Sequence, residues 1–276
     1  MRGARPAPPN DAVTEQDRAP YGVLLQVAYT GTAYHGWATQ RAARSVEETL
    51  RGAVLALDPR AGVLRGASRT DAGVHAEGQL VAFDATRAIP ARGWVLGLNR
   101  HLPEDVAVRA ARPAPPGFSP RFAARSKRYR YRVLVDFVRD PGWQARAWRV
   151  PLLDVAAMEH EAVSARGTHD FAAFRSAGDE RPSTERTLYR VDVAREADPR
   201  VVAVIVEGSA FLYNMVRILV GTMVDVARGR LDVGAVGRAL AARDRGYAGT
   251  TAPAHGLVLE QVDLGAVEGL GEPWPR

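Results

Sequence analysis

The sequence contains no cysteine among its 276 residues. This absence excludes disulfide bonds, thiolate nucleophiles and zinc sites built from cysteine. A single lysine, Lys127, makes chemistry through a Schiff base a poor alternative. The six histidines include no closely spaced pair on one helix face, so we expect no metal site. Carboxylates therefore remain the best candidates for a nucleophile.

Long apolar runs are also missing. The longest, from Val201 to Val206, is far too short to cross a membrane. No charged start is followed by an apolar stretch, so no secretory signal is expected. Hydrophobic residues make up 46% of the chain and charged residues 25%, which is typical of a soluble globular protein. We therefore expect a cytoplasmic protein without a membrane partner.

Positive charge is plentiful, with a formal net charge of +6 carried almost wholly by arginine. The excess alone only hints at nucleic acid, so its clustering matters more. Within residues 121–132, strand alternation would place the arginines at 128, 130 and 132 on one face. Tyr129 and Tyr131 would then lie on the other face. This pattern favours RNA recognition through phosphate contacts and base stacking. The alternative, a solvated arginine face over tyrosines in the core, is the one we favour for Tyr131.

Residues 66–79 form a stretch of glycines and small residues around which the chain is organised. Gly66, Gly73 and Gly78 permit tight turns and a close approach of the backbone to a ligand. Asp71 lies in the middle of this stretch, and Arg69 stands two residues before it. A cation so near would hold the carboxylate ionised and aimed, as a nucleophile or base requires. An aspartate that merely serves a turn is the commoner interpretation of such a pattern.

Residues 69–75, Arg-Thr-Asp-Ala-Gly-Val-His, closely resemble the signature of the TruA family of tRNA pseudouridine synthases. Further motifs are similar to the family in the same order along the chain. They are a basic-Tyr-basic-Tyr run at residues 128–131, Met-Val-Arg at 215–217, and Ala-Pro…Gly-Leu-x-Leu at 252–259. The resemblance spans residues 21 to about 263. The chain departs from the family at Thr30, where Asp is usual, and at Ser68, where Gly is usual.

The resemblance implies a role for five residues. Asp71 matches the catalytic aspartate of the signature, and Arg69 lies beside it. Tyr129 matches the tyrosine that stacks on the target base. Arg217 matches the arginine that reaches into the cleft to pair with the aspartate. Leu257 would wall the base pocket, although a simple core leucine fits the sequence equally well.

The family fold implied is α/β (α+β), with two related domains, antiparallel or mixed sheets, helices on one face, and the active site in the cleft between the domains. We expect a disordered basic tail at residues 1–20, whose arginines would be available for contact with RNA. An N-terminal α/β domain would follow at residues 21–112 and carry the catalytic loop. A C-terminal α/β domain would occupy residues 113–276. Four prolines and a glycine at residues 113–120 mark the expected crossing.

Local patterns predict the main elements. Strands are expected at residues 21–29, 106–110, 187–193 and 201–206, and an edge strand is expected after residue 256. Helices are expected at residues 45–57, 91–99 and 153–164, with Ser45 and Asp154 as caps. Another helix should open at Phe211, and a short one should be capped by Asp232 with Val233 facing inward. For Trp37, core packing and an RNA-facing platform both stay open.

The implied reaction is isomerisation of uridine to pseudouridine at positions 38, 39 and 40 in the anticodon arm of tRNA, without cofactor or metal. Asp71 would either add covalently to the nucleotide or remove a ribose proton, and the sequence does not choose between these routes. The resemblance also implies a homodimer.

Two other functions stay open. A non-catalytic RNA-binding module could use the same basic-aromatic strand. A carboxylate-dependent hydrolase acting on RNA would need a second acid near Asp71, and Glu77 is the one carboxylate close to it in the motif.

Overall fold

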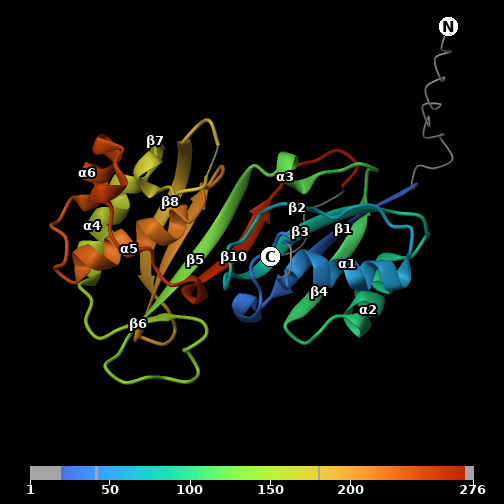
Figure 1. Ribbon diagram of the computed structural model, residues 1–276, viewed down its shortest axis with the longest axis horizontal. Helices are drawn as coiled ribbons and strands as arrows, with labels where there is room; N and C mark the ends of the chain where they lie inside the picture. Colours follow the sequence, from blue (N-terminus) through green and yellow to red (C-terminus); the bar gives the residue numbers. More distant parts are fainter. Residues whose placement is uncertain (1–19, 41–42, 180, 271–276) are drawn as a thin grey trace, which may run out of the picture.

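The computed structural model describes residues 20–40, 43–179 and 181–270 (Figure 1). Almost all of the expected basic tail lies outside these residues. The described strands form one mixed sheet in the order β4-β1-β3-β10-β5-β9-β8-β7, with β2 paired to β3 and β6 paired to β5. Their bounds are β1 Tyr21–Tyr29, β2 Arg65–Gly66, β3 His75–Ala85, β4 Val106–Ala114, β5 Ser126–Val135, β6 Trp148–Val150, β7 Gly167–Asp170, β8 Glu185–Arg195, β9 Val201–Gly208 and β10 Leu257–Asp263.

Six α-helices of the described chain accompany the sheet: α1 Val46–Leu57, α2 Ala91–His101, α3 Pro120–Ala123, α4 Val155–Ala165, α5 Met215–Ala227 and α6 Ala235–Ala242. Figure 1 shows α1 and α2 over the strands of the N-terminal half, and α4, α5 and α6 over those of the C-terminal half. The predicted class, a mixed sheet with helices packed on it, is confirmed. None of the described helices is long and apolar enough to cross a membrane.

The predicted helix caps have clear geometry. Ser45 accepts a hydrogen bond from the Glu48 backbone N–H at 3.2 Å, which satisfies one free donor of the first turn of α1. Asp154 does the same for α4 through the Ala157 N–H at 3.1 Å. Strand β9 is flanked by β5 and β8 and is buried along most of its length, as its unbroken β-branched run predicts.

The predicted edge strand at the end of the chain is wrong. Strand β10 lies in the middle of the sheet, parallel to β3 and antiparallel to β5. It therefore joins strands that come from the two halves of the sequence. Local alternation can identify a strand, but its neighbours are set by contacts far away in the chain, so the pattern could not give its place.

The predicted start of α5 is four residues early. Phe211 and Leu212 are irregular, and Tyr213 and Asn214 form a turn in which Asp179 accepts the Tyr213 N–H at 2.7 Å. Asn214 follows with a φ of 59°, a left-handed conformation that a continuing helix does not contain. The helix therefore begins at Met215.

Asp232 does not cap α6, and Val233 does not face inward. Val233 is 58% exposed, and Gly234 is the N-cap residue with a φ of 85°. The carboxylate of Glu161, on α4, accepts the backbone N–H groups of Gly234 and Val236 instead. A partner from another helix thus replaces the expected local cap, and it also fixes α6 against α4.

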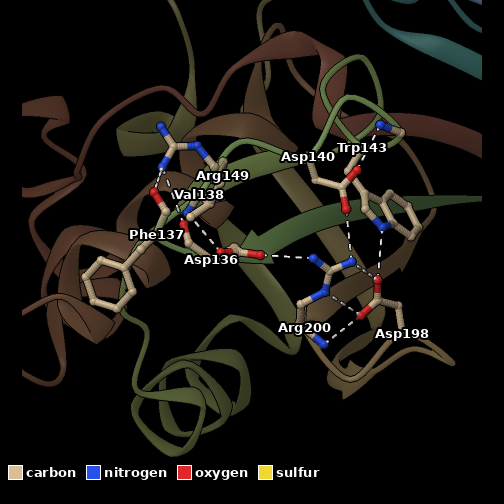
Figure 2. Close-up of polar contacts among 9 residues, drawn as sticks. Asp136, Phe137, Val138, Asp140, Trp143, Arg149, Asp198 and Arg200 are labelled. Atoms are coloured by element: carbon tan, nitrogen blue, oxygen red, sulfur yellow. Dashed lines mark hydrogen bonds and ion pairs between the residues drawn. The ribbon is translucent and has the colours of Figure 1, made fainter.

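A loop at residues 136–147 is held down by Arg200 (Figure 2). The guanidinium reaches three carboxylates, those of Asp136 and Asp140 at 2.9 Å and that of Asp198 at 2.8 Å. Phe137 lies in the same loop, 71% exposed, and Figure 2 shows its ring directed away from the polar cluster. This ring therefore belongs to an ordered but exposed surface.

Candidate active site

The loop that carries Asp71 connects β2 to β3, and these strands pair antiparallel. Gln79, fully buried on β3, holds the loop through both backbone groups of Ser68. Its amide oxygen accepts the Ser68 N–H at 3.1 Å, and its amide nitrogen donates to the Ser68 carbonyl at 2.6 Å. The amide side chain thereby fixes the backbone three residues before Asp71.

A second set of contacts holds the loop from the β1–α1 connection. The hydroxyls of Tyr29 and Thr70 lie 2.7 Å apart, and the Trp37 N–H donates to the Thr70 carbonyl at 3.0 Å. Gly36 has a φ of 97°, and a Cβ there would lie 2.7 Å from the Thr70 carbonyl oxygen, so only glycine fits. Trp37 is 2% exposed and a Cβ at Gly66 would meet its ring, which places this tryptophan in the core rather than on an RNA platform.

Strand β10 brings the tyrosine strand to the loop. Leu259 is the register partner of Ala76 on β3 and of Tyr129 on β5. Tyr129 thus stands one strand away from the end of the catalytic loop. The hydroxyls of Ser68 and Tyr129 lie 2.9 Å apart in a buried contact. The departure from the family glycine at position 68 therefore adds a direct bond between the loop and the tyrosine.

Arg217 reaches Asp71 from the first turn of α5. Its Nη1 lies 3.8 Å from Oδ2 of Asp71, and the two side chains are 17% and 20% exposed. The guanidinium is held in place by the Ala252 carbonyl, which accepts from Nε at 2.8 Å. The side-chain oxygen of Asn214 accepts from Nη1 at 2.6 Å. The charge pair is therefore partly buried and supported on both sides.

Burial raises the pKa of the Asp71 carboxyl to about 6, although the charges of Arg217 and Arg181 act to lower it. The expectation that Arg69 holds this carboxylate ionised is wrong. Arg69 is exposed, and no ion pair joins it to Asp71. Thr70 between them is buried, so the turn directs the two neighbouring side chains differently. The cations beside Asp71 come from the second half of the chain.

Tyr129 is 6% exposed, and its ring meets that of Phe211 edge to face with centroids 5.1 Å apart. Burial raises the pKa of its phenol to about 12, and the charge of Asp71 adds to that rise. The side chain is therefore a neutral, fixed aromatic surface at the site. Tyr131 is fully buried and donates its hydroxyl to the Pro253 carbonyl at 2.8 Å, which confirms the core role predicted for it.

Leu257 opens β10 and is the register partner of Tyr131. It is 4% exposed, so it packs within the core on the strand that borders the site. The structure thus brings together Asp71, Arg217 and Tyr129, places Leu257 in the adjoining core, and leaves Arg69 outside.

Two cationic side chains near Asp71, those of Lys127 and Arg181, were not identified from sequence patterns. Lys127 donates its ammonium to the Ala67 carbonyl at 2.7 Å, and burial, together with the charges of Arg121 and Arg181, lowers its pKa to about 8. Arg181 pairs with Asp179 at 3.3 Å and donates to the Phe211 carbonyl. Lys127 could have been noticed as the single lysine beside the tyrosine motif. Arg181 lies in an irregular segment whose sequence carries no periodic signal.

The arginines of β5 at 128, 130 and 132 lie on the face opposite Tyr129 and are paired rather than solvated. Arg128 contacts Glu207 at 2.8 Å, and Arg130 and Arg132 both contact Glu196 at 3.0 Å. These arginines therefore meet carboxylates on neighbouring strands, and a phosphate could bind them only by competing with those partners.

Among the described residues, no other carboxylate acts on the pKa of Asp71, and Asp179 beside this group pairs with Arg181. Glu77 is exposed, and the charges that shift the pKa of Asp71 come from arginines alone. No described group of three or more His, Asp or Glu side chains is arranged to hold a metal ion. A single carboxylate beside an arginine and an aromatic ring can act as a nucleophile or base on a bound nucleotide.

Comparisons with known proteins agree on one family. The family model described as "tRNA pseudouridine synthase" matches residues 162–263. The chain is 42% identical to tRNA pseudouridine synthase A of Citrifermentans bemidjiense over 242 residues, 87% of this chain and 96% of the relative. It is 43% identical to tRNA pseudouridine synthase A of Geobacter sulfurreducens, again over 87% of this chain and 98% of the relative.

Proposed function

The chain belongs to the TruA family of tRNA pseudouridine synthases, and from that premise we propose that it isomerises uridine to pseudouridine in tRNA. The observation that carries the proposal is the meeting of Asp71, Arg217 and Tyr129 in one largely buried cluster. Arg217 lies 3.8 Å from the carboxylate, and Tyr129 is bonded to the same loop through Ser68. We further propose that the targets are uridines 38, 39 and 40 of the anticodon arm.

The proposed catalyst is Asp71. With a pKa of about 6 the carboxyl is mostly ionised at neutral pH, and this pKa is near enough to the working pH for the group to accept and release a proton. It either adds to the nucleotide or removes a ribose proton while the glycosidic bond breaks. The detached uracil then rotates and its C5 forms the new bond to the ribose, while the bond to Asp71 breaks or the ribose proton returns. The C5 proton is then lost, and N1, left as an anion by the broken glycosidic bond, gains a proton. Arg217 holds the carboxylate in position during these steps.

Binding of the target nucleotide is assigned to the aromatic side of the pocket. A base inside a helix is out of reach, so it has to leave the stack before it can react. We propose that it stacks on Tyr129, and that Leu257 bounds the pocket behind it. The rigid edge-to-face contact with Phe211 supports this role, since it fixes the tyrosine ring before the base arrives.

The wider organisation is proposed on the same basis. Two domains, at residues 21–112 and 113–276, would each contribute part of the site. The sheet order supports this division, since β1 to β4 lie on one side of β10 and β5 to β9 on the other. Residues 113 and 114 still belong to β4, so the crossing would fall just after them. We also propose a homodimer that acts in the cytoplasm.

The test is to incubate the purified protein with a tRNA transcript and to map pseudouridine in the product. Wild type should form it at positions 38 to 40, and Asp71→Asn should form none. Glu77→Gln, a change in an exposed carboxylate on β3 just after the same loop, is the matched control and should stay active. Tight binding without any conversion would favour an RNA-binding module, and strand cleavage that depends on Glu77 would favour a hydrolase.

A further inference from the structure

Phe122 on α3 is more exposed than any other large apolar side chain in the described part of the chain, at 85%. The residues around it in α3 are held by burial and by backbone hydrogen bonds. Pro120 opens the helix and is buried, and the N–H groups of Phe122 and Ala123 both donate to the Ser119 carbonyl at 3.2 Å. The ring is therefore held out into solvent by an ordered turn.

The turn is anchored at both of its ends. Before it, Arg65 donates Nε to the Phe118 carbonyl at 2.7 Å. After it, the Arg125 N–H donates to the Asp263 carbonyl on β10 at 2.8 Å. Arg65 itself belongs to β2, which leads directly into the loop of Asp71. The exposed ring thus has a fixed place beside β2, the strand that leads into the loop of Asp71.

Positively charged groups stand at this ring, at the loop of Asp71 and near Asp71 itself. The guanidinium of Arg121 lies 5.9 Å from the centroid of the Phe122 ring. Its charge acts on the ammonium of Lys127, which donates to the Ala67 carbonyl in the loop of Asp71. Arg181 acts on both Lys127 and Asp71. A sequence of positive groups therefore runs from α3 to the catalytic carboxylate.

We propose that Phe122 and Arg121 form a second RNA contact outside the catalytic pocket, where an unpaired base stacks on the phenyl ring and the guanidinium binds a neighbouring phosphate. The proposal rests on the function proposed above, since it names a further contact with the same RNA. An exposed aromatic ring with an arginine beside it is a combination that binds single-stranded bases. The bound nucleotide would be one that flanks the target uridine, because the cations lead from this ring to Asp71.

The test compares the affinity for a tRNA transcript of wild type, Phe122→Ala, Phe122→Trp and Phe137→Ala. Phe122→Ala should weaken binding by about 5- to 150-fold, the usual loss for one stacked base. Phe122→Trp should bind within a few-fold of wild type because it keeps a stacking surface. Phe137→Ala removes the exposed ring of the 136–147 loop and should bind like wild type.

Two further measurements separate the roles. Arg121→Ala should lower the slope of log affinity against log salt by about 0.7, as expected for one phosphate on a single strand, while Phe122→Ala should leave that slope unchanged. In single-turnover measurements, Phe122→Ala should raise the enzyme concentration needed for the half-maximal rate, because the ring acts in RNA binding.

Equal tRNA affinity of Phe122→Ala and wild type would overturn the second contact and leave the isomerase function standing. A loss of affinity that tracks dissociation of an oligomer would also overturn it and assign the ring to a contact between copies of the chain. Conversely, an affinity loss restricted to Phe122→Ala would uphold the contact even if the wild-type protein bound tRNA and formed no pseudouridine.

Discussion

The substitution Asp71→Asn should make the protein more stable at neutral pH while it abolishes the reaction. Asn has nearly the same size as the protonated carboxyl and keeps its capacity for hydrogen bonds. Burial raises the folded-state pKa of Asp71 from 3.8 to about 6, so the charged form is disfavoured in the fold even with two arginines nearby. The charge required for chemistry is therefore held at a cost in stability.

The sign and size of this cost follow from proton linkage. Between about pH 4 and about pH 6 the folded protein holds more protons on Asp71 than the unfolded chain does, so its stability falls as the pH rises. Above the folded pKa the penalty is complete. A difference of roughly 2 in pKa corresponds to about 3 kcal/mol. Relative to wild type, Asp71→Asn should thus gain about 3 kcal/mol between about pH 4 and about pH 7.5.

The assay is urea unfolding of both proteins at several pH values across this window. The difference between the two free energies of unfolding is the quantity of interest, because the titration of other groups cancels in it. Asp84→Asn provides a control of opposite sign. Burial acts to raise the pKa of Asp84, but hydrogen bonds from Arg65 outweigh it and hold that pKa below its usual value. Relative to wild type, this control should lose stability as the pH rises toward about 4, below the window of Asp71, and should stay constant above it. A difference for Asp71→Asn that stays constant with pH would refute the reasoning.

The remaining predictions concern activity and the residues around Asp71. The single-turnover rate of wild type should fall as the pH drops below about 6, because Asp71 must be ionised to act, and a pH profile that is flat down to about pH 4 would contradict this. Tyr129→Phe should keep most of the tRNA affinity but slow turnover, whereas Tyr129→Ala should weaken both; equal affinity of the Ala variant and wild type would argue against stacking. Arg217→Ala should lose activity and stability at neutral pH, since it leaves the Asp71 charge partly buried without its partner, and thermal unfolding with a tRNA assay would reveal either loss. Ser68→Gly and Tyr129→Phe should be strongly non-additive in turnover rate, because each removes the same hydroxyl pair; additive effects would separate the two residues.

Motifs in the sequence identified residues that meet in the fold more reliably than sequence distance did. Asp71, Tyr129 and Arg217 were identified through motifs, and the structure brings all three together although they are far apart in the chain. Arg69 was placed beside the carboxylate on sequence distance alone, and it points outward. Residues two apart in a tight turn share no fixed direction, so proximity in sequence could not decide their contact.

Local sequence patterns could not predict contacts between side chains of one element and groups of another. Glu161 caps α6 from a different helix, and Arg181 approaches Asp71 from an irregular segment. Neither has a periodicity or spacing that relates it to its partner. The caps of Ser45 and Asp154 were predicted because each bonds a backbone group within its own first turn. Contacts between residues a few positions apart could therefore be predicted from the sequence, and contacts between distant elements could not.

The active site is also part of the joint between the two halves of the sheet. Strand β10 pairs with β3 through Val258 and Leu259. Backbone pairing therefore joins the two halves of the sheet over a short length. The bond from Lys127 to the Ala67 carbonyl and the contact between Ser68 and Tyr129 cross the same boundary. These contacts fix how far the catalytic loop stands from the tyrosine. Because the serine adds one bond that a glycine could not make, this chain holds the loop of Asp71 to Tyr129 more firmly than it would with glycine at position 68.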